Sequence, residues 1–334
     1  MIPLPHFSRR RTVLTYLASG ACSIGTFTGL AHAQAFPNRP IRLVVPVAAG
    51  GGTDLIARVV ADALSRNMGH PWVVNNQSGA GGQIASQSTA SAIADGYNLM
   101  IGYVSTHGTL PAVRKLPYDT QKDFSYIGMI GGAPNVLVAN ATSGPQSFQQ
   151  FLSDVRANPG KASFGSAGAG TITHLVFERL KAATKTFIVH VPYRGIAPVM
   201  TDLLANQIQY TMPGLAGVLN HIRSGKVKAL AVTGPRRHSL LPDVPTLKEL
   251  GLPDFEAVQW VGIMGPAGIP ADVSQKLTTS LNEVLKQKEL AEKLTSEGIE
   301  LMPMSVEAFQ SYVAADFERW REVVKSRGIK ESLT

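Results

Sequence analysis

The segment from Ile41 to Gly69 constrains the fold more than any other part of the chain. An apolar, β-branched run, Ile41–Val45, ends at Pro46 and is followed by small residues and three glycines, 50–52. Apolar residues then recur at helical spacing on one face, with charged residues on the other, until Gly69 and a following proline. The pattern predicts a strand, a glycine-rich turn and an amphipathic helix.

The turn before this helix is a candidate anion site. The first backbone N–H groups of a helix have no partner within the helix and lie at the positive end of its dipole. They can bind a carboxylate or phosphate without a lysine or arginine. We therefore expect unpaired amides around Gly50; a tight βα turn that holds no ligand is the alternative.

The same alternation of strand and helix continues through the first half of the chain. A second strand is predicted at 72–75, a glycine loop at 78–82, a helix at 83–94 and a third strand at 97–102. Such alternation predicts a parallel sheet with helices on both faces. Because ligands bind beyond the carboxyl ends of such strands, Ser105, Thr106 and His107 form a second candidate wall of the site.

A second strand, glycine turn and helix occurs at 162–183, with glycines at 165, 168 and 170. We interpret it as a second anion-binding turn of the same kind. The loop Tyr193–Pro198 then precedes another predicted helix. Two such assemblies predict two lobes that hold an anion between their turns, since ligand sites favour domain interfaces.

Residues 1–35 have the pattern of a signal peptide. Arg9–Arg11 precede an apolar stretch of small residues, and Ala31-His32-Ala33 fits a small-x-small cleavage site. Both the general and the twin-arginine export routes stay open. Cys22, the only cysteine, lies within this segment and could carry a lipid; a chain cleaved near residue 35 has no disulfide and no thiolate nucleophile. We expect a periplasmic protein.

Composition narrows the class of protein further. Hydrophobic residues make up 44% of the 334 residues and charged residues 16%, which indicates a globular core. The formal net charge is +8, but the positive residues are scattered and no basic run contains aromatics. We expect a basic protein that does not bind nucleic acid. Apolar stripes at 273–285 and 306–324 predict packed C-terminal helices, the second ending at Gly328.

Tests for enzyme motifs fail. Neither glycine turn completes a dinucleotide fingerprint, and neither is followed by a P-loop lysine. Ser166 lacks the first glycine of a hydrolase elbow, because Phe164 stands two residues before it. The histidines form no pair spaced for a metal, so His107 and His174 are interpreted as structural or hydrogen-bonding residues. Asp54, at a helix start, is interpreted as a dipole-stabilising or capping residue. The sequence predicts no catalytic residue, no metal and no cofactor.

An ordered set of short motifs carries a family resemblance over essentially the whole mature chain. They include Pro46–Gly51, Asp95-Gly96-Tyr97, His190–Gly195, Leu241–Thr246 and Gly265–Gly268. With this set the chain resembles the Bug-type extracytoplasmic solute receptors, the substrate-binding proteins of tripartite tricarboxylate transporters. Each motif alone is weak, but their order is specific.

The resemblance implies an α/β, type II periplasmic-binding-protein fold, with two lobes joined by two crossover segments around a ligand cleft. Residues 36–137 and 255–334 would form lobe 1, and residues 138–254 lobe 2. In the family, backbone amides and water between two loops hold a ligand carboxylate. The implied ligand-binding residues here are Ala48, Ala49, Gly50, Gly51, Thr53, Ser105, Thr106, His107, Ser166, Ala167, Gly168, Thr171, Tyr193, Gly195, Ile196 and Ala197.

One departure from the family bears on the ligand. Many members place a polar or acidic residue where this chain has Met212-Pro213-Gly214-Leu215. If this loop lines the pocket, it favours a carboxylate with an apolar or aromatic body over citrate or a polar amino acid. The implied partners are a small carboxylate and the subunits of a membrane permease, and we expect a monomer. A receptor for a sensor kinase and, less favoured, a secreted enzyme for an anionic metabolite are the alternatives.

Overall fold

The structure is a computed structural model that describes residues 36–253 and 255–327. The predicted signal peptide, Cys22 and the helix end expected at Gly328 lie outside these residues. Among the helices described, none is both long and apolar enough to cross a membrane.

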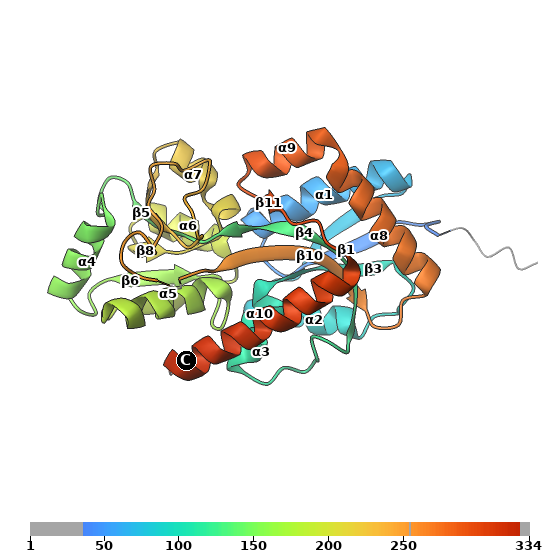
Figure 1. Cartoon of the computed structure of the whole chain (residues 1–334), viewed down its shortest axis with the longest axis horizontal. Helices are drawn as coiled ribbons and strands as arrows, with labels where there is room; N and C mark the ends of the chain where they lie inside the picture. Colours follow the sequence, from blue (N-terminus) through green and yellow to red (C-terminus); the bar gives the residue numbers. More distant parts are fainter. Residues whose placement is uncertain (1–35, 254, 328–334) are drawn as a thin grey trace, which may run out of the picture. The chain divides into compact units, whose positions relative to one another are not determined.

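Two separate β-sheets organise the chain from Phe36 onward (Figure 1). A six-stranded sheet has the order β11-β4-β10-β3-β1-β2 and a five-stranded sheet the order β7-β6-β8-β5-β9. The strands are β1 (Ile41–Val45), β2 (Trp72–Asn76), β3 (Asn98–Tyr103), β4 (Phe124–Pro134), β5 (Val136–Asn140), β6 (Ser163–Ser166), β7 (Val189–Pro192), β8 (Tyr210–Thr211), β9 (Val227–Val232), β10 (Val258–Pro266) and β11 (Glu300–Leu301). We call the part of the chain built on each sheet a lobe, lobe 1 for the larger sheet and lobe 2 for the smaller.

Helices follow most of these strands, as the alternating pattern predicts. The α-helices are α1 (Gly52–Met68), α2 (Gln83–Ala90), α3 (Leu110–Val113), α4 (Phe148–Ala157), α5 (Ile172–Thr184), α6 (Ile196–Leu204), α7 (Leu219–Arg223), α8 (Ala271–Lys286), α9 (Lys288–Ser296) and α10 (Val306–Arg327). Short turns of other helix types are η1 (Ala80–Gly82), η2 (Ser105–Thr109) and η3 (Leu215–Gly217). The predicted strand–turn–helix units at β1–α1 and β6–α5 are therefore present.

The prediction of a parallel sheet is confirmed for the strands on which it was based, but both sheets are mixed. Strand β1 pairs in parallel with β2 and β3, and β6 pairs in parallel with β7 and β8. Strand β10, however, pairs antiparallel with both β3 and β4, and the two long strands β4 and β10 run side by side (Figure 1). The reason is topological: β4 leads the chain out of the larger sheet, and β10 brings it back in the opposite direction.

The two connections between the lobes are fastened to each other. The first passes from β4 to β5 through Asn135, and the second runs from β9 to β10. The buried Thr233 accepts the Asn135 N–H at 2.9 Å and donates its hydroxyl to the Ala257 carbonyl at 2.7 Å. This hydroxyl thus links both connections. The lobe boundaries at 137 and 254 implied by the resemblance stay a prediction.

The C-terminal helices pack as their apolar stripes predict. In α8, Leu277, Leu281 and Val284 are buried, and in α10 Phe309 and Trp320 are buried. Helix α8 contacts β4 and α1, whereas α10 contacts β4 and the turn η2 that follows β3. The C-terminal helices therefore cover the larger sheet and support the end of β3, where the candidate polar cluster begins.

Candidate functional site

A cavity lies where the two lobes meet. Its walls come from the ends of strands and the starts of helices in both lobes, and each of the described residues that lines it is uncharged. The lining residues are Val47, Gly51, Gly52, Thr53, Tyr103, Ser105, Ala167, Ile172, Thr173, Ile196, Pro213, Gly214, Gly217 and Gln259. Helices α1, α5 and α6 each present their N-terminal residues to this cavity.

The N-terminus of α1 supplies unpaired donors from lobe 1. Its N-cap residue, Gly51, has no side chain with which to cap the helix, and within the described residues the amides of Gly51, Gly52 and Thr53 have no acceptor. The expectation of a free amide at Gly50 is wrong, because this N–H donates to the Asp54 carboxylate at 2.9 Å. The free donors therefore begin one residue later than expected.

Asp54 holds the turn in shape. Its carboxylate accepts hydrogen bonds from the Gly50 amide, from Arg58 at 3.0 Å and from Asn76 at 2.8 Å, and Asn76 also donates to the Val47 carbonyl. Burial raises the pKa of Asp54, but these hydrogen bonds and the Arg58 charge outweigh it, so the pKa lies below its ordinary value. Asp54 is thus an ionised support beneath the turn, not a helix cap toward the cavity.

The N-terminus of α6 supplies the matching donors from lobe 2. Within the part of the chain that the structure describes, the amides of Gly195, Ile196 and Ala197 have no acceptor. Gly195 has a φ of 130°, and a Cβ there would lie 3.2 Å from the Ala48 nitrogen. Ala48 in turn donates to the Arg194 carbonyl at 3.3 Å. Only glycine fits this conformation and this approach between the loops.

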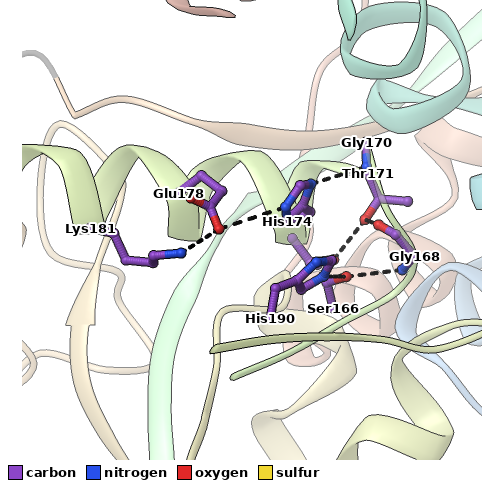
Figure 2. A network of polar contacts seen from close by, with 9 residues as sticks. Ser166, Gly168, Gly170, Thr171, His174, Glu178, Lys181 and His190 are labelled. Atoms are coloured by element: carbon purple, nitrogen blue, oxygen red, sulfur yellow. Dashed lines mark hydrogen bonds and ion pairs between the residues drawn. The ribbon is translucent and has the colours of Figure 1, made fainter. Parts of the chain in front are cut away.

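The turn before α5 differs from the other two, and our interpretation of it as a second anion-binding turn is wrong (Figure 2). Three of its amides are already paired with local side chains. Ala167 N–H donates to Thr173 at 2.8 Å, Gly168 N–H to Ser166 at 3.2 Å and Gly170 N–H to His174 at 3.1 Å. Polar side chains next to this glycine turn thus accept from the amides that an anion would need. One amide at the start of α5, that of Thr173, is an exception and has no acceptor among the described residues.

The histidines of this network are held neutral. His190 hydrogen-bonds Ser166 at 2.6 Å and stacks on His174 with ring centroids 4.0 Å apart (Figure 2). Burial, then the neighbouring His190 and Lys181, lower the pKa of His174 to about 3, and burial and Lys181 lower that of His190 to about 4. Burial also lowers the pKa of His107 to about 3. None of the three therefore supplies a fixed positive charge at neutral pH, and the structural roles that the sequence indicates for His107 and His174 stay predictions.

The structure distributes the predicted ligand-binding residues over four environments. Gly51, Thr53, Ser105, Ala167 and Ile196 line the cavity. Ala48, Ala49, Gly50, Gly195 and Ala197 belong to the loops that carry the lining residues, whereas Gly168 and Tyr193 line a neighbouring, more open cavity. Thr106, His107, Ser166 and Thr171 are fully buried behind the walls, and Thr106, Ser166 and Thr171 take part in internal hydrogen bonds. Their roles toward a ligand stay predictions.

Sequence reasoning missed several lining residues. Gln259 accepts the Gly214 N–H at 3.1 Å and donates to Thr53 at 3.4 Å, so it joins the α1 turn to the loop after β8. Tyr103, whose pKa burial raises to about 12, donates to the Gly81 carbonyl. Tyr103 is the last residue of β3, so the rule that ligands bind beyond the carboxyl ends of strands could have indicated it. Gln259 lies about 200 residues after Thr53 in the sequence, and no local pattern indicates it.

The loop at Met212–Leu215 does reach the cavity. Pro213 and Gly214 line it, whereas Met212 and Leu215 are buried beneath. The preference for a ligand with an apolar or aromatic body depended on whether this loop lines the pocket. Pro213 and Gly214 meet that condition, because both belong to the cavity wall. Among the described residues, no group of three or more histidine, cysteine or acidic side chains is arranged for a metal.

Comparison with known proteins agrees with this geometry. Residues 56–329 match the family described as the tripartite tricarboxylate transporter family receptor. BugT of Bordetella pertussis is 34% identical over 300 residues, covering 89% of this chain and 92% of that protein. This match extends over nearly the whole length of both chains.

Two solved structures share both fold and sequence with the chain. An R. palustris protein with adipate is 33% identical, with a TM-score of 0.85 over 88% of this chain and 99% of that one. MatC from Rhodopseudomonas palustris with bound malate is 31% identical, with a TM-score of 0.83 over 86% and 100%. The chain therefore belongs to the tripartite tricarboxylate transporter receptor family, whose members are solute receptors with the two-lobed periplasmic-binding-protein fold.

Proposed function

We propose that the protein is a periplasmic receptor that captures a small carboxylate between its two lobes and delivers it to a tripartite tricarboxylate-type permease. The observation that carries this proposal is the meeting of unpaired amides from α1 and α6 at an uncharged cavity. A pocket with donors and no fixed charge is complementary to an anion that needs several hydrogen bonds.

The amides come from opposite lobes, which couples ligand binding to lobe closure. Gly51 and Gly52 lie in lobe 1, and Ile196 lies in lobe 2. A carboxylate with one oxygen toward each set would contact both lobes only in the closed form. The ligand therefore favours closure by its differential affinity for that form. Closure also removes water, and this strengthens each hydrogen bond to the charged oxygen.

The rest of the cavity favours an apolar or weakly polar ligand body. Val47, Ile172, Ile196 and Pro213 provide apolar wall, and among the described residues no lysine or arginine lines the cavity to neutralise a third carboxylate. The relatives with adipate and with malate show that this fold accommodates dicarboxylates. We propose a di- or tricarboxylate, or an aromatic or apolar carboxylate, as the ligand, with the aliphatic dicarboxylates and benzoates favoured over citrate.

Isothermal titration calorimetry of the purified protein tests the proposal with adipate, malate, benzoate, citrate and glutamate. We expect binding of at least one dicarboxylate or benzoate, and none of the uncharged adipamide. Binding of citrate or glutamate alone would contradict the apolar-body assignment. Failure of every carboxylate would contradict the receptor function, and chemical conversion of a bound ligand would show an enzyme instead.

Delivery to a permease needs a separate test. Family membership implies permease subunits as partners. We expect uptake of the bound carboxylate into cells or proteoliposomes that contain the permease only when the receptor is added. Uptake that does not depend on the receptor, together with receptor-dependent induction of genes, would instead favour a partner in signalling.

A further inference from the structure

A second, more open cavity lies beside the uncharged cavity, and we call it the vestibule. Its walls include Gly81 and Arg114 from lobe 1 and Gly168, Tyr193 and Arg194 from lobe 2. The vestibule adjoins the inner cavity at two places. Tyr103, which lines the inner cavity, donates to the Gly81 carbonyl, and Gly168 follows the lining residue Ala167.

The vestibule differs from the inner cavity in charge. Of the described residues that line it, Arg114 and Arg194 are charged, and both are positive. Arg194 is exposed, and its side chain makes no hydrogen bond or ion pair within the described part of the chain. The guanidinium of Arg114 is held by the Ala80 carbonyl at 2.7 Å. One arginine thus stands on each lobe.

We propose that the vestibule is an outer anion site, where Arg194 and Arg114 attract a dicarboxylate and raise the rate at which it is captured. This proposal rests on the receptor function given above. The two arginines do not line the inner cavity, so they set the association rate and leave the bound complex largely unchanged. Charges at the mouth of a cleft act mainly on diffusional encounter.

The position of the arginines outside the inner cavity has a physical reason. An arginine inside the cavity would bind a dianion strongly and slow its release, whereas a receptor must release its ligand to a partner. An exposed guanidinium outside the cavity attracts at long range and is screened by salt. The site therefore speeds capture without adding an ion pair that release would have to break.

Stopped-flow tryptophan fluorescence tests the proposal with adipate or malate, whichever the wild-type protein binds. At about 20 mM salt we expect Arg194→Gln to lower the association rate constant about three- to fivefold and Arg194→Glu about tenfold, with dissociation little changed. At about 0.5 M salt the difference should nearly vanish. Arg194→Lys keeps the charge and should keep the wild-type rate.

Lys248→Gln is the matched control, because Lys248 is exposed and lies outside the vestibule. It removes the same charge and should leave the rate unchanged. Equal rates for Arg194→Gln and the wild type at low salt would overturn the proposal, as would a slow Arg194→Lys variant or an effect confined to dissociation. If the wild-type protein binds neither dicarboxylate and no other carboxylate, the receptor function itself fails, and the vestibule proposal fails with it.

Discussion

The turns before α1 and α5 have similar sequences and opposite arrangements of their amides. Each joins a strand to a helix through glycines and small residues. In the α1 turn the amides of Gly51 and Gly52 are left without acceptors among the described residues, whereas in the α5 turn those of Gly168 and Gly170 are paired with Ser166 and His174. A glycine turn therefore becomes a donor site only where neighbouring side chains leave its amides free.

The side chains around each turn explain the difference. At the α1 turn, the one backbone amide of the turn from which the buried Asp54 accepts is that of Gly50, which lies just outside the helix end, so Asp54 fixes the loop without using the cavity donors. At the α5 turn, Ser166 and Thr173 accept from amides within the turn itself. The first arrangement favours ligand binding, and the second makes a rigid wall.

The largest effect is expected from Asp54→Ala. The variant removes the acceptor for the Gly50 and Asn76 N–H groups at a buried site, so we expect a loss of about 2–4 kcal/mol in the free energy of unfolding and weaker ligand binding. Urea denaturation and calorimetry measure the two effects. Asp62→Ala, on the exposed face of the same helix, should change stability by less than about 0.5 kcal/mol. Equal losses for the two variants would contradict the role given to Asp54.

Gly52→Ala tests whether the α1 turn must approach lobe 2 closely. A Cβ at residue 52 would lie 2.6 Å from the Gly217 nitrogen and 2.9 Å from the Ala216 carbonyl carbon. Overpacking of this kind should destabilise the closed form by about 1–3 kcal/mol. We therefore expect a roughly 5- to 150-fold loss of ligand affinity, measured by calorimetry.

Gly51→Ala is the control for this substitution. A Cβ at residue 51 meets only the Ala48 oxygen, at 3.9 Å, and the φ of −86° suits alanine. Small-angle scattering should show the ligand-saturated Gly52→Ala protein to be more open than the Gly51→Ala protein. Identical scattering and affinity for the two would show that closure does not require glycine at position 52.

Ser166→Ala separates the wall from the donor site. Ser166 is fully buried, accepts the Gly168 N–H and hydrogen-bonds His190. Its loss should lower the free energy of unfolding by about 1–2 kcal/mol and change ligand affinity by less than about threefold. A large loss of affinity with unchanged stability would instead place Ser166 in contact with the ligand.

The smallest effect is expected from lowering the pH, which should reduce the free energy of unfolding through His174. Because the folded pKa of His174, about 3, lies below that of an unfolded histidine, about 6.5, its contribution to stability is complete above pH 6.5 and is lost as pH falls. Between pH 7.5 and 5.5 this amounts to about 1 kcal/mol. His174→Gln keeps an acceptor for the Gly170 N–H without titrating, so its unfolding free energy should vary less with pH. An unchanged pH dependence would contradict the assignment of a neutral, buried His174.

The fold could be predicted from sequence because its signals are local. Hydrophobic spacing and glycines define β1–α1 and β6–α5, and the ordered motifs indicate the two lobes. The antiparallel pairing of β10 could not be predicted in this way, because it joins residues more than 100 positions apart. Gln259 is missed for the same reason, since only the return of the chain to lobe 1 brings it to Thr53.

The site was predictable at the level of the loops and not at the level of the atoms. Gly51, Thr53 and Ile196 line the cavity as the loop assignments indicate. Which amides remain free depends on side-chain geometry, as the paired Gly50 and Gly168 show. Glycine content alone does not contain that information.

A crystal structure of the protein with a bound dicarboxylate tests the central claim most directly. We predict a carboxylate oxygen that accepts from amides at the N-termini of both α1 and α6, either directly at about 3 Å or through one bridging water, with the amides of Gly168 and Gly170 still paired within their turn. A carboxylate bound instead by the α5 turn, or by side chains alone with the Gly51, Gly52 and Ile196 amides unused, would contradict the account.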